Sequence, residues 1–171
     1  AEDFDMFVMV DRTLGSFSKS FASLGGFIAA DASVYKYIKH FSREFIFSAS
    51  IPPSATAAAL ASLKIIEAEP ERRENLWKNA RRMNREFKAM GFDTRSSETP
   101  IVPVLIGQDM DTFKFWRLLF DNGIFANKAI SPAVEPGMAL IRTSYTATHI
   151  DEHLDRVLEV FHKVGKQTGS I

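Results

Sequence analysis

The sequence predicts an α/β fold in two parts, the second of which is a compact α+β unit. Two observations carry this prediction. Short apolar runs of strand length alternate along the chain with amphipathic segments of helix length. In the second part the segments follow in the order strand, helix, strand, strand, helix, which is typical of an α+β unit. We expect the boundary in a long helix near residues 83–91, with a first domain over residues 1–88 and a second over residues 89–171.

The first part combines short apolar runs with a glycine- and serine-rich loop and two helices. Asp31 is placed to cap the first helix, Pro53 suits the first turn of the second, and Pro70 ends it. The predicted elements are strands over residues 6–10, 27–30 and 44–50, a loop over residues 15–26, and helices over residues 33–41 and 54–69.

A long charged helix over residues 71–91 leads into the second part. Leu76, Ala80, Met83 and Phe87 recur in it at spacings of three and four residues, which predicts one apolar face and a solvated charged face. Further elements follow: strands over residues 99–107, 124–130 and 138–145, helices over residues 110–123 and 149–165, and a turn-rich loop over residues 131–137. The prolines in the first of these strands predict that it lies at a sheet edge.

The composition excludes several classes of function. The 21 lysines and arginines balance the 21 aspartates and glutamates, so charge gives no reason to expect nucleic acid or an anionic membrane as a partner. Cysteine is absent, which excludes thiol catalysis and makes the cytoplasm the simpler expectation. No apolar run approaches the roughly 20 residues of a membrane helix, and no signal peptide is recognised. The chain starts almost directly with a predicted strand and has no initiator methionine, so we expect it to be part of a larger protein.

Lys19 is the first candidate for chemistry, although a lysine is most often an ordinary surface charge. It lies in the segment GSFSKSFASLGGF, where glycines permit close backbone approach and serines offer hydroxyl groups to an anion. A lysine that acts through a Schiff base needs a carbonyl compound held beside it. A cofactor with both a phosphate and an aldehyde would meet that need.

Arg142 is the second candidate, because it interrupts the apolar strand ALIRTSY. It is either part of an internal salt bridge or an exposed edge position, or it is a clamp for a substrate carboxylate, which suits guanidinium geometry. His149 and His153 are spaced four apart on a helix, but no third ligand is evident, so we predict no metal site.

Seven blocks of the sequence are similar, in order and in approximate spacing, to the α-oxoamine synthases, and most of all to the bacterial serine palmitoyltransferases. The blocks are FSKSFASLGGF, FSASIPP, FKAMGFDT, ETPIVPV, LLFDNGIFAN, SPAVEPG and IRTSYTATHI. These enzymes use pyridoxal 5′-phosphate and have the aspartate-aminotransferase fold, fold type I. The resemblance implies that the chain is the C-terminal part of such an enzyme, with the end of the large-domain sheet followed by a small α+β domain.

The resemblance also implies roles for four residues. Lys19 corresponds to the lysine that forms a Schiff base with the cofactor, and Ser16 to a residue that contacts its phosphate. Ser48 corresponds to a residue that reaches the phosphate of the neighbouring subunit, which implies a homodimer with a shared active site. Arg142 corresponds to the arginine that holds the amino-acid carboxylate. Relative to the family, residues 10–14 lengthen the junction before the lysine, and serine replaces the commoner threonine at position 16.

The activity implied is the decarboxylative condensation of an amino acid with an acyl-CoA. For L-serine and palmitoyl-CoA this gives a 3-oxo amine and is the first step of sphingolipid synthesis, whose lipid product is compatible with loose contact at the inner membrane. One alternative is another α-oxoamine synthase, either 8-amino-7-oxononanoate synthase or 2-amino-3-ketobutyrate CoA ligase. The other is an inactive fragment or partner subunit, because the family's first half supplies the rest of the cofactor pocket.

Overall fold

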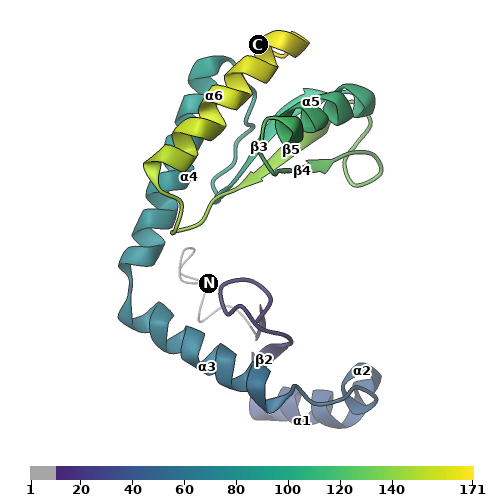
Figure 1. Ribbon diagram of the computed structural model, residues 1–171. Helices are drawn as coiled ribbons and strands as arrows, with labels where there is room; N and C mark the ends of the chain where they lie inside the picture. Colours follow the sequence, from purple (N-terminus) through teal and green to yellow (C-terminus); the bar gives the residue numbers. More distant parts are fainter. Residues whose placement is uncertain (1–10) are drawn as a thin grey trace. The chain divides into compact units, whose positions relative to one another are not determined.

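Figure 1 shows the computed structural model, which describes residues 11–171. The chain divides into two compact units, residues 1–69 and residues 70–171, which are taken in turn. The strand predicted over residues 6–10 lies outside the described residues. Within the described part of the chain, no helix combines the length and the apolar character that crossing a membrane requires.

The first unit contains an antiparallel hairpin of β1 (Arg12–Ser16) and β2 (Gly26–Ala30). The strand predicted over residues 27–30 is confirmed. β1 was not predicted, because its sequence RTLGS has no apolar run, and its pairing with β2 makes it a strand. The loop predicted over residues 15–26 is therefore shorter than expected.

Three helices follow the hairpin: α1 (Ala32–Phe41), α2 (Arg43–Ile46) and α3 (Pro53–Ala68). α1 and α3 confirm the two predicted helices of this part. Asp31 is the N-cap residue of α1, but its side chain makes no capping hydrogen bond. Pro53 lies in the first turn of α3, as predicted.

The strand predicted over residues 44–50 is wrong, because α2 occupies its first residues and no strand follows. The Ser42 hydroxyl accepts a hydrogen bond from the Phe45 N–H at 3.3 Å and so caps a short helix. The apolar side chains that suggested a buried strand are exposed, Phe47 by 81%.

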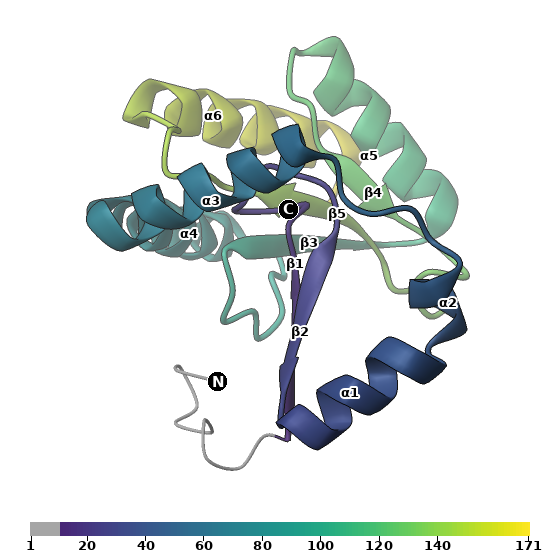
Figure 2. The same ribbon diagram turned by 90° about the horizontal axis from the view of Figure 1, so that it is seen from below.

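The second unit begins with α4 (Glu71–Met90), which ends at Gly91 in the left-handed conformation. A three-stranded antiparallel sheet follows in the order β3-β5-β4, made of β3 (Ile101–Gly107), β5 (Ala139–Ser144) and β4 (Asn127–Ala129). The remaining helices are α5 (Asp109–Asp121) and α6 (Asp151–Thr168), which pack against each other in Figure 2. All the elements predicted for this part are confirmed, including the edge position of β3.

The core of the second unit is a cluster of aromatic and aliphatic side chains between the helices and one face of the sheet. Phe161 of α6 has no exposed surface, and its ring centroid lies 4.8 Å from that of Phe87 and 5.7 Å from that of Phe115. α4 contributes Met83 and Phe87 to this cluster. The compact units therefore divide at the start of α4, between Glu69 and Pro70, and not within the helix, because its apolar face packs with the C-terminal elements.

A buried amide joins α4 to the turn between β5 and α6. Asn79 is 5% exposed, and its Nδ2 donates hydrogen bonds to the carbonyl oxygens of Thr146, at 3.0 Å, and His149, at 2.9 Å. This contact fixes the segment that follows the strand carrying Arg142.

Candidate functional site

Lys19 lies in the connection between β1 and β2, residues 17–25, and its side chain is exposed. The connection is closed by backbone hydrogen bonds: the Phe17 N–H donates to the Gly25 carbonyl and the Ala22 N–H to the Lys19 carbonyl, both at 2.9 Å. The Phe17 and Phe21 rings contact each other edge to face, with centroids 5.2 Å apart. The lysine is therefore presented on a short ordered loop, open to a carbonyl compound from outside.

The base of this loop depends on glycine for the close approach of the two strands. A Cβ atom on Gly26 would lie less than 3.0 Å from the Gly15 carbonyl oxygen, a distance that real Cβ atoms essentially never show. Gly25 has φ +89°, which favours glycine. The predicted close approach of the backbone is thus present at this point of the hairpin.

Ser16 lies at the end of β1 beside the loop, and its side chain is exposed. Its hydroxyl lies 2.8 Å from the Ser18 hydroxyl and accepts a hydrogen bond from the Ser18 N–H at 3.3 Å. The hydroxyl groups of Ser16 and Ser18 and the Ser18 N–H thus lie close together, within three residues of Lys19 in the sequence. Hydroxyl and amide donors of this kind suit an anionic oxygen.

Two other serines have structural uses. The Ser23 hydroxyl donates to the Ala55 carbonyl at 2.6 Å, and the Ser62 hydroxyl donates to the Phe21 carbonyl at 3.0 Å. Both bonds tie the lysine loop to α3. From the sequence, Ser23 was a candidate donor to an anion. The structural use of Ser62 could not be predicted, because its bonding partner lies 41 residues away in the sequence.

Ser48 follows α2, is exposed, and makes no hydrogen bond with the described residues. It lies in the first unit with Lys19 and Ser16, whereas Arg142 lies in the second unit. No described residue of the first unit forms a hydrogen bond with the Ser48 hydroxyl, so this group is available to bond with a partner molecule.

Arg142 lies on β5, the central strand of the second sheet. Residues 139, 141 and 143 of this strand are buried, so Arg142 projects from the opposite face, where it is exposed. It has no ion pair within residues 11–171. Arg142 is therefore not at a sheet edge, and the described residues contain no salt-bridge partner for it.

A cavity of about 300 Å³ near the end of β5 is lined by Tyr145, His149 and His153. Burial lowers the pKa of His149, and the charge of the neighbouring His153 lowers it further. The described residues contain no group of three or more side chains suited to a metal ion. Burial also raises the pKa of Tyr145, an effect that the nearby Thr143 hydroxyl opposes only in part.

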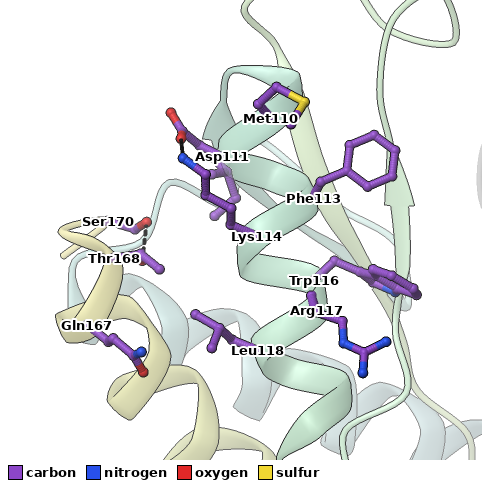
Figure 3. Close-up of a pocket in the computed structure, with 11 residues that line it drawn as sticks. Met110, Asp111, Phe113, Lys114, Trp116, Arg117, Leu118, Gln167, Thr168 and Ser170 are labelled. Atoms are coloured by element: carbon purple, nitrogen blue, oxygen red, sulfur yellow. Dashed lines mark hydrogen bonds and ion pairs between the residues drawn. The ribbon is translucent and has the colours of Figure 1, made fainter.

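Another cavity, of about 820 Å³, lies along α5 and the end of α6 (Figure 3). Its walls include Met110 and Phe113. Charged side chains in its wall pair with neighbours on the same helix: the Lys114 Nζ lies 3.3 Å from a carboxylate oxygen of Asp111. It contains none of the predicted site residues.

Comparison with known proteins matches residues 6–161 to the class I and II aminotransferase family. A serine palmitoyltransferase of Sphingobacterium spiritivorum is 43% identical over 167 residues, which cover 98% of this chain and 42% of the relative. An 8-amino-7-oxononanoate synthase of Thermoanaerobacter pseudethanolicus is 37% identical over 171 residues, which cover 100% of this chain and 43% of the relative. A solved structure of SPT with a PLP internal aldimine has a TM-score of 0.94 at 34% identity, over 99% of this chain and 43% of that one.

The chain thus spans less than half the length of the relatives that it matches. The structural match confirms the predicted fold class, an α/β fold like that of the fold type I aminotransferases. The roles of Lys19, Ser16, Ser48 and Arg142 stay predictions.

Proposed function

Because the chain belongs to the class I and II aminotransferase family, we propose that it carries the cofactor-binding lysine of a pyridoxal-phosphate-dependent α-oxoamine synthase. The proposed reaction joins L-serine to the acyl group of a long-chain acyl-CoA, palmitoyl-CoA, and gives a 3-oxo amine, CO2 and free CoA. The observation that carries the proposal is the presentation of Lys19 on a short ordered loop beside the Ser16 and Ser18 hydroxyls.

The residues of this loop fit pyridoxal phosphate. The cofactor has an aldehyde, for which the exposed Lys19 Nζ is a nucleophile, and a phosphate, for which the Ser16 hydroxyl is a donor. The glycines at the base of the loop allow the close strand approach that holds Lys19 and Ser16 near each other in the chain. When bound, the cofactor withdraws electrons from the amino acid's Cα. Lys19 would hold the cofactor aldehyde, and Ser16 would orient the phosphate.

Arg142 is proposed to bind the carboxylate of the amino-acid substrate. Its guanidinium group is exposed and free of carboxylate partners in residues 11–171, so no bond to these residues has to break when the substrate binds. Two parallel N–H···O bonds would fix the orientation of the carboxylate. Ser48 is proposed to contact the cofactor phosphate of a second subunit, which would make the active site shared within a homodimer.

The exposed apolar surface of the first unit supports the view that other polypeptide covers it. Leu14 is 76% exposed and Phe41 is 67% exposed, while a two-stranded hairpin is only marginally stable by itself in water. β1 and β2 pair only with each other among the described strands, so each offers a free edge. We propose that the remaining part of the enzyme and the second subunit pack against these strands.

The second candidate function is that of 8-amino-7-oxononanoate synthase, which is favoured by the 37% identity over the whole chain. The two functions differ in the amino acid consumed. Release of free CoA, measured in parallel with serine, alanine and glycine and the matching acyl-CoA, separates them. Release with serine supports the serine palmitoyltransferase function, and release with alanine alone contradicts it.

The proposed role of Lys19 is tested by Lys19→Ala in the complete holoenzyme. Turnover is expected to fall by at least about a thousandfold, because covalent attachment and proton transfer at Nζ are both lost. Lys36→Ala, on the exposed surface of α1, is the matched control and should retain turnover. Normal turnover in Lys19→Ala would overturn the assignment, and a colourless wild-type preparation with no affinity for the cofactor would favour an inactive fragment.

A further inference from the structure

Asn127 of β4 lies directly opposite Arg142 in the antiparallel pairing of β4 and β5. Residues opposite each other in such a pair project from the same face of the sheet, with Cβ atoms about 5 Å apart. Both side chains are exposed. The Asn127 amide therefore projects from the same face of the sheet as the Arg142 side chain and directly beside its base.

The other neighbours of Arg142 on this face are less polar. On the β3 side its partner is Pro103, and along β5 the same face carries Leu140 and Ser144. Asn127 is thus the directly opposed side chain that can donate a hydrogen bond. It makes none with the described residues.

Among the arginines of its unit, Arg142 differs in that it makes no ion pair, ring contact or side-chain hydrogen bond with the described residues. Each other arginine in residues 70–171 has an ion pair, a ring contact or another polar interaction: Arg72, Arg73, Arg81, Arg82, Arg85, Arg95, Arg117 and Arg156. On the opposite face of β4, Lys128 is also engaged, with its Nζ 3.6 Å from the centroid of the Trp116 ring. The face that carries Arg142 and Asn127 therefore presents unused hydrogen-bond donors.

We propose that Asn127 is a second binding residue for the amino-acid carboxylate. Its Nδ2–H donates to the carboxylate oxygen on the β4 side, while the Arg142 guanidinium group binds both oxygens. A carboxylate has about four lone-pair sites, so it can accept the amide bond beside the bidentate pair. This inference rests on the proposed function, which assigns the carboxylate to Arg142.

The Asn127→Asp variant gives the sharpest test. It keeps the shape of the side chain but replaces a hydrogen-bond donor for the carboxylate with a negative charge that repels it. The new carboxylate would lie opposite Arg142 and pair with it across the strands, in the place of the substrate. We expect the affinity for L-serine to fall about a hundredfold in Asn127→Asp, as in Arg142→Gln. In Asn127→Ala we expect a fall of about tenfold, the loss of one hydrogen bond to a charged group.

The measurement is the dissociation constant of the amine from the complete holoenzyme, followed by the absorbance of the bound cofactor and not by turnover. L-Serine is compared with ethanolamine, and L-alanine with ethylamine, because each second compound lacks the carboxylate. Affinity for the two amines without a carboxylate should change less than about twofold in every variant. Asn75→Asp, an exposed position on α4, adds the same charge elsewhere in the unit and should change neither affinity.

The outcomes separate this inference from the proposed function. If Arg142→Gln weakens serine binding and both Asn127 variants bind serine normally, the role of Asn127 is overturned and the proposed function stands. If Asn127→Asp weakens serine and ethanolamine equally, the effect does not involve the carboxylate, and the inference fails. If Arg142→Gln leaves all affinities unchanged, the carboxylate assignment itself is wrong.

Discussion

The Gly26→Ala variant tests whether the close approach of β1 and β2 is what shapes the lysine loop. The added Cβ atom would lie less than 3.0 Å from the Gly15 carbonyl oxygen and 3.5 Å from the Ser16 Cα. Both neighbours are backbone atoms, so no side chain can rotate away to relieve the overlap. The hairpin must instead separate at the point where Ser16 pairs with Gly26.

The expected cost follows from this geometry. Overpacking a close contact typically costs about 1–3 kcal/mol, and here the strain falls on the native hairpin that presents Lys19. If the cofactor binds only the undistorted hairpin, about 2 kcal/mol corresponds to roughly a 30-fold loss of cofactor affinity. We therefore expect Gly26→Ala to bind pyridoxal phosphate about 30-fold more weakly than the unmodified enzyme.

The assay is a titration of the apoenzyme with pyridoxal phosphate, followed by absorbance, with a thermal melt of each variant. Gly123→Ala is the control: its φ of +82° makes the alanine strained, but its Cβ would meet no atom within 4 Å. This control should lose stability without losing cofactor affinity. Unchanged cofactor affinity in Gly26→Ala would refute the idea that the strand approach shapes the site.

Two further predictions concern the second unit. Phe161→Ala should lower the free energy of unfolding in urea by about 3–5 kcal/mol, because a fully buried ring is lost from the aromatic cluster. The control Phe125→Ala, at a position that is 80% exposed, should change this free energy by about 0.5 kcal/mol or less. Equal effects of the two substitutions would show that Phe161 is not part of a stabilising core. Tyr145→Phe should leave the free energy of unfolding unchanged or raise it, because the buried Tyr145 hydroxyl makes no hydrogen bond of ordinary geometry with the described residues. The nearby Thr143 hydroxyl donates its hydrogen bond to the Val102 carbonyl oxygen. Since burial raises the pKa of Tyr145 above its usual 10.0, the folded state keeps a proton that the unfolded state loses, so stability should fall above pH 10 in the parent protein and less in the variant. A large loss of stability in Tyr145→Phe, or an unchanged alkaline slope, would contradict this reasoning.

The sequence predicted the second unit well because its elements are strongly periodic and bounded by clear stop signals. Gly91 ends α4 as expected, and the prolines of β3 place it at the sheet edge. The first unit was predicted less well. Residues 44–50 read as a buried strand, but the Ser42 cap forms a helix there, and the described residues supply no strand to pair with it.

The candidate site shows a similar division. Lys19 and Arg142 could be selected by residue type, because each is a cation in an unusual setting. Asn127 could not be selected in this way, because its place beside Arg142 depends on the register between two strands that are separate in the sequence. The structural use of Ser62 was equally invisible, since its partner Phe21 is distant in sequence.

The Schiff-base role of Lys19 is tested most simply when the complete holoenzyme is reduced with borohydride and the modified peptide is mapped by mass spectrometry. Reduction makes the bond between the lysine and the cofactor permanent. We expect a single phosphopyridoxyl adduct, on Lys19, and no adduct in Lys19→Ala. An adduct on another lysine, or bound cofactor with Lys19 unmodified, would contradict this role.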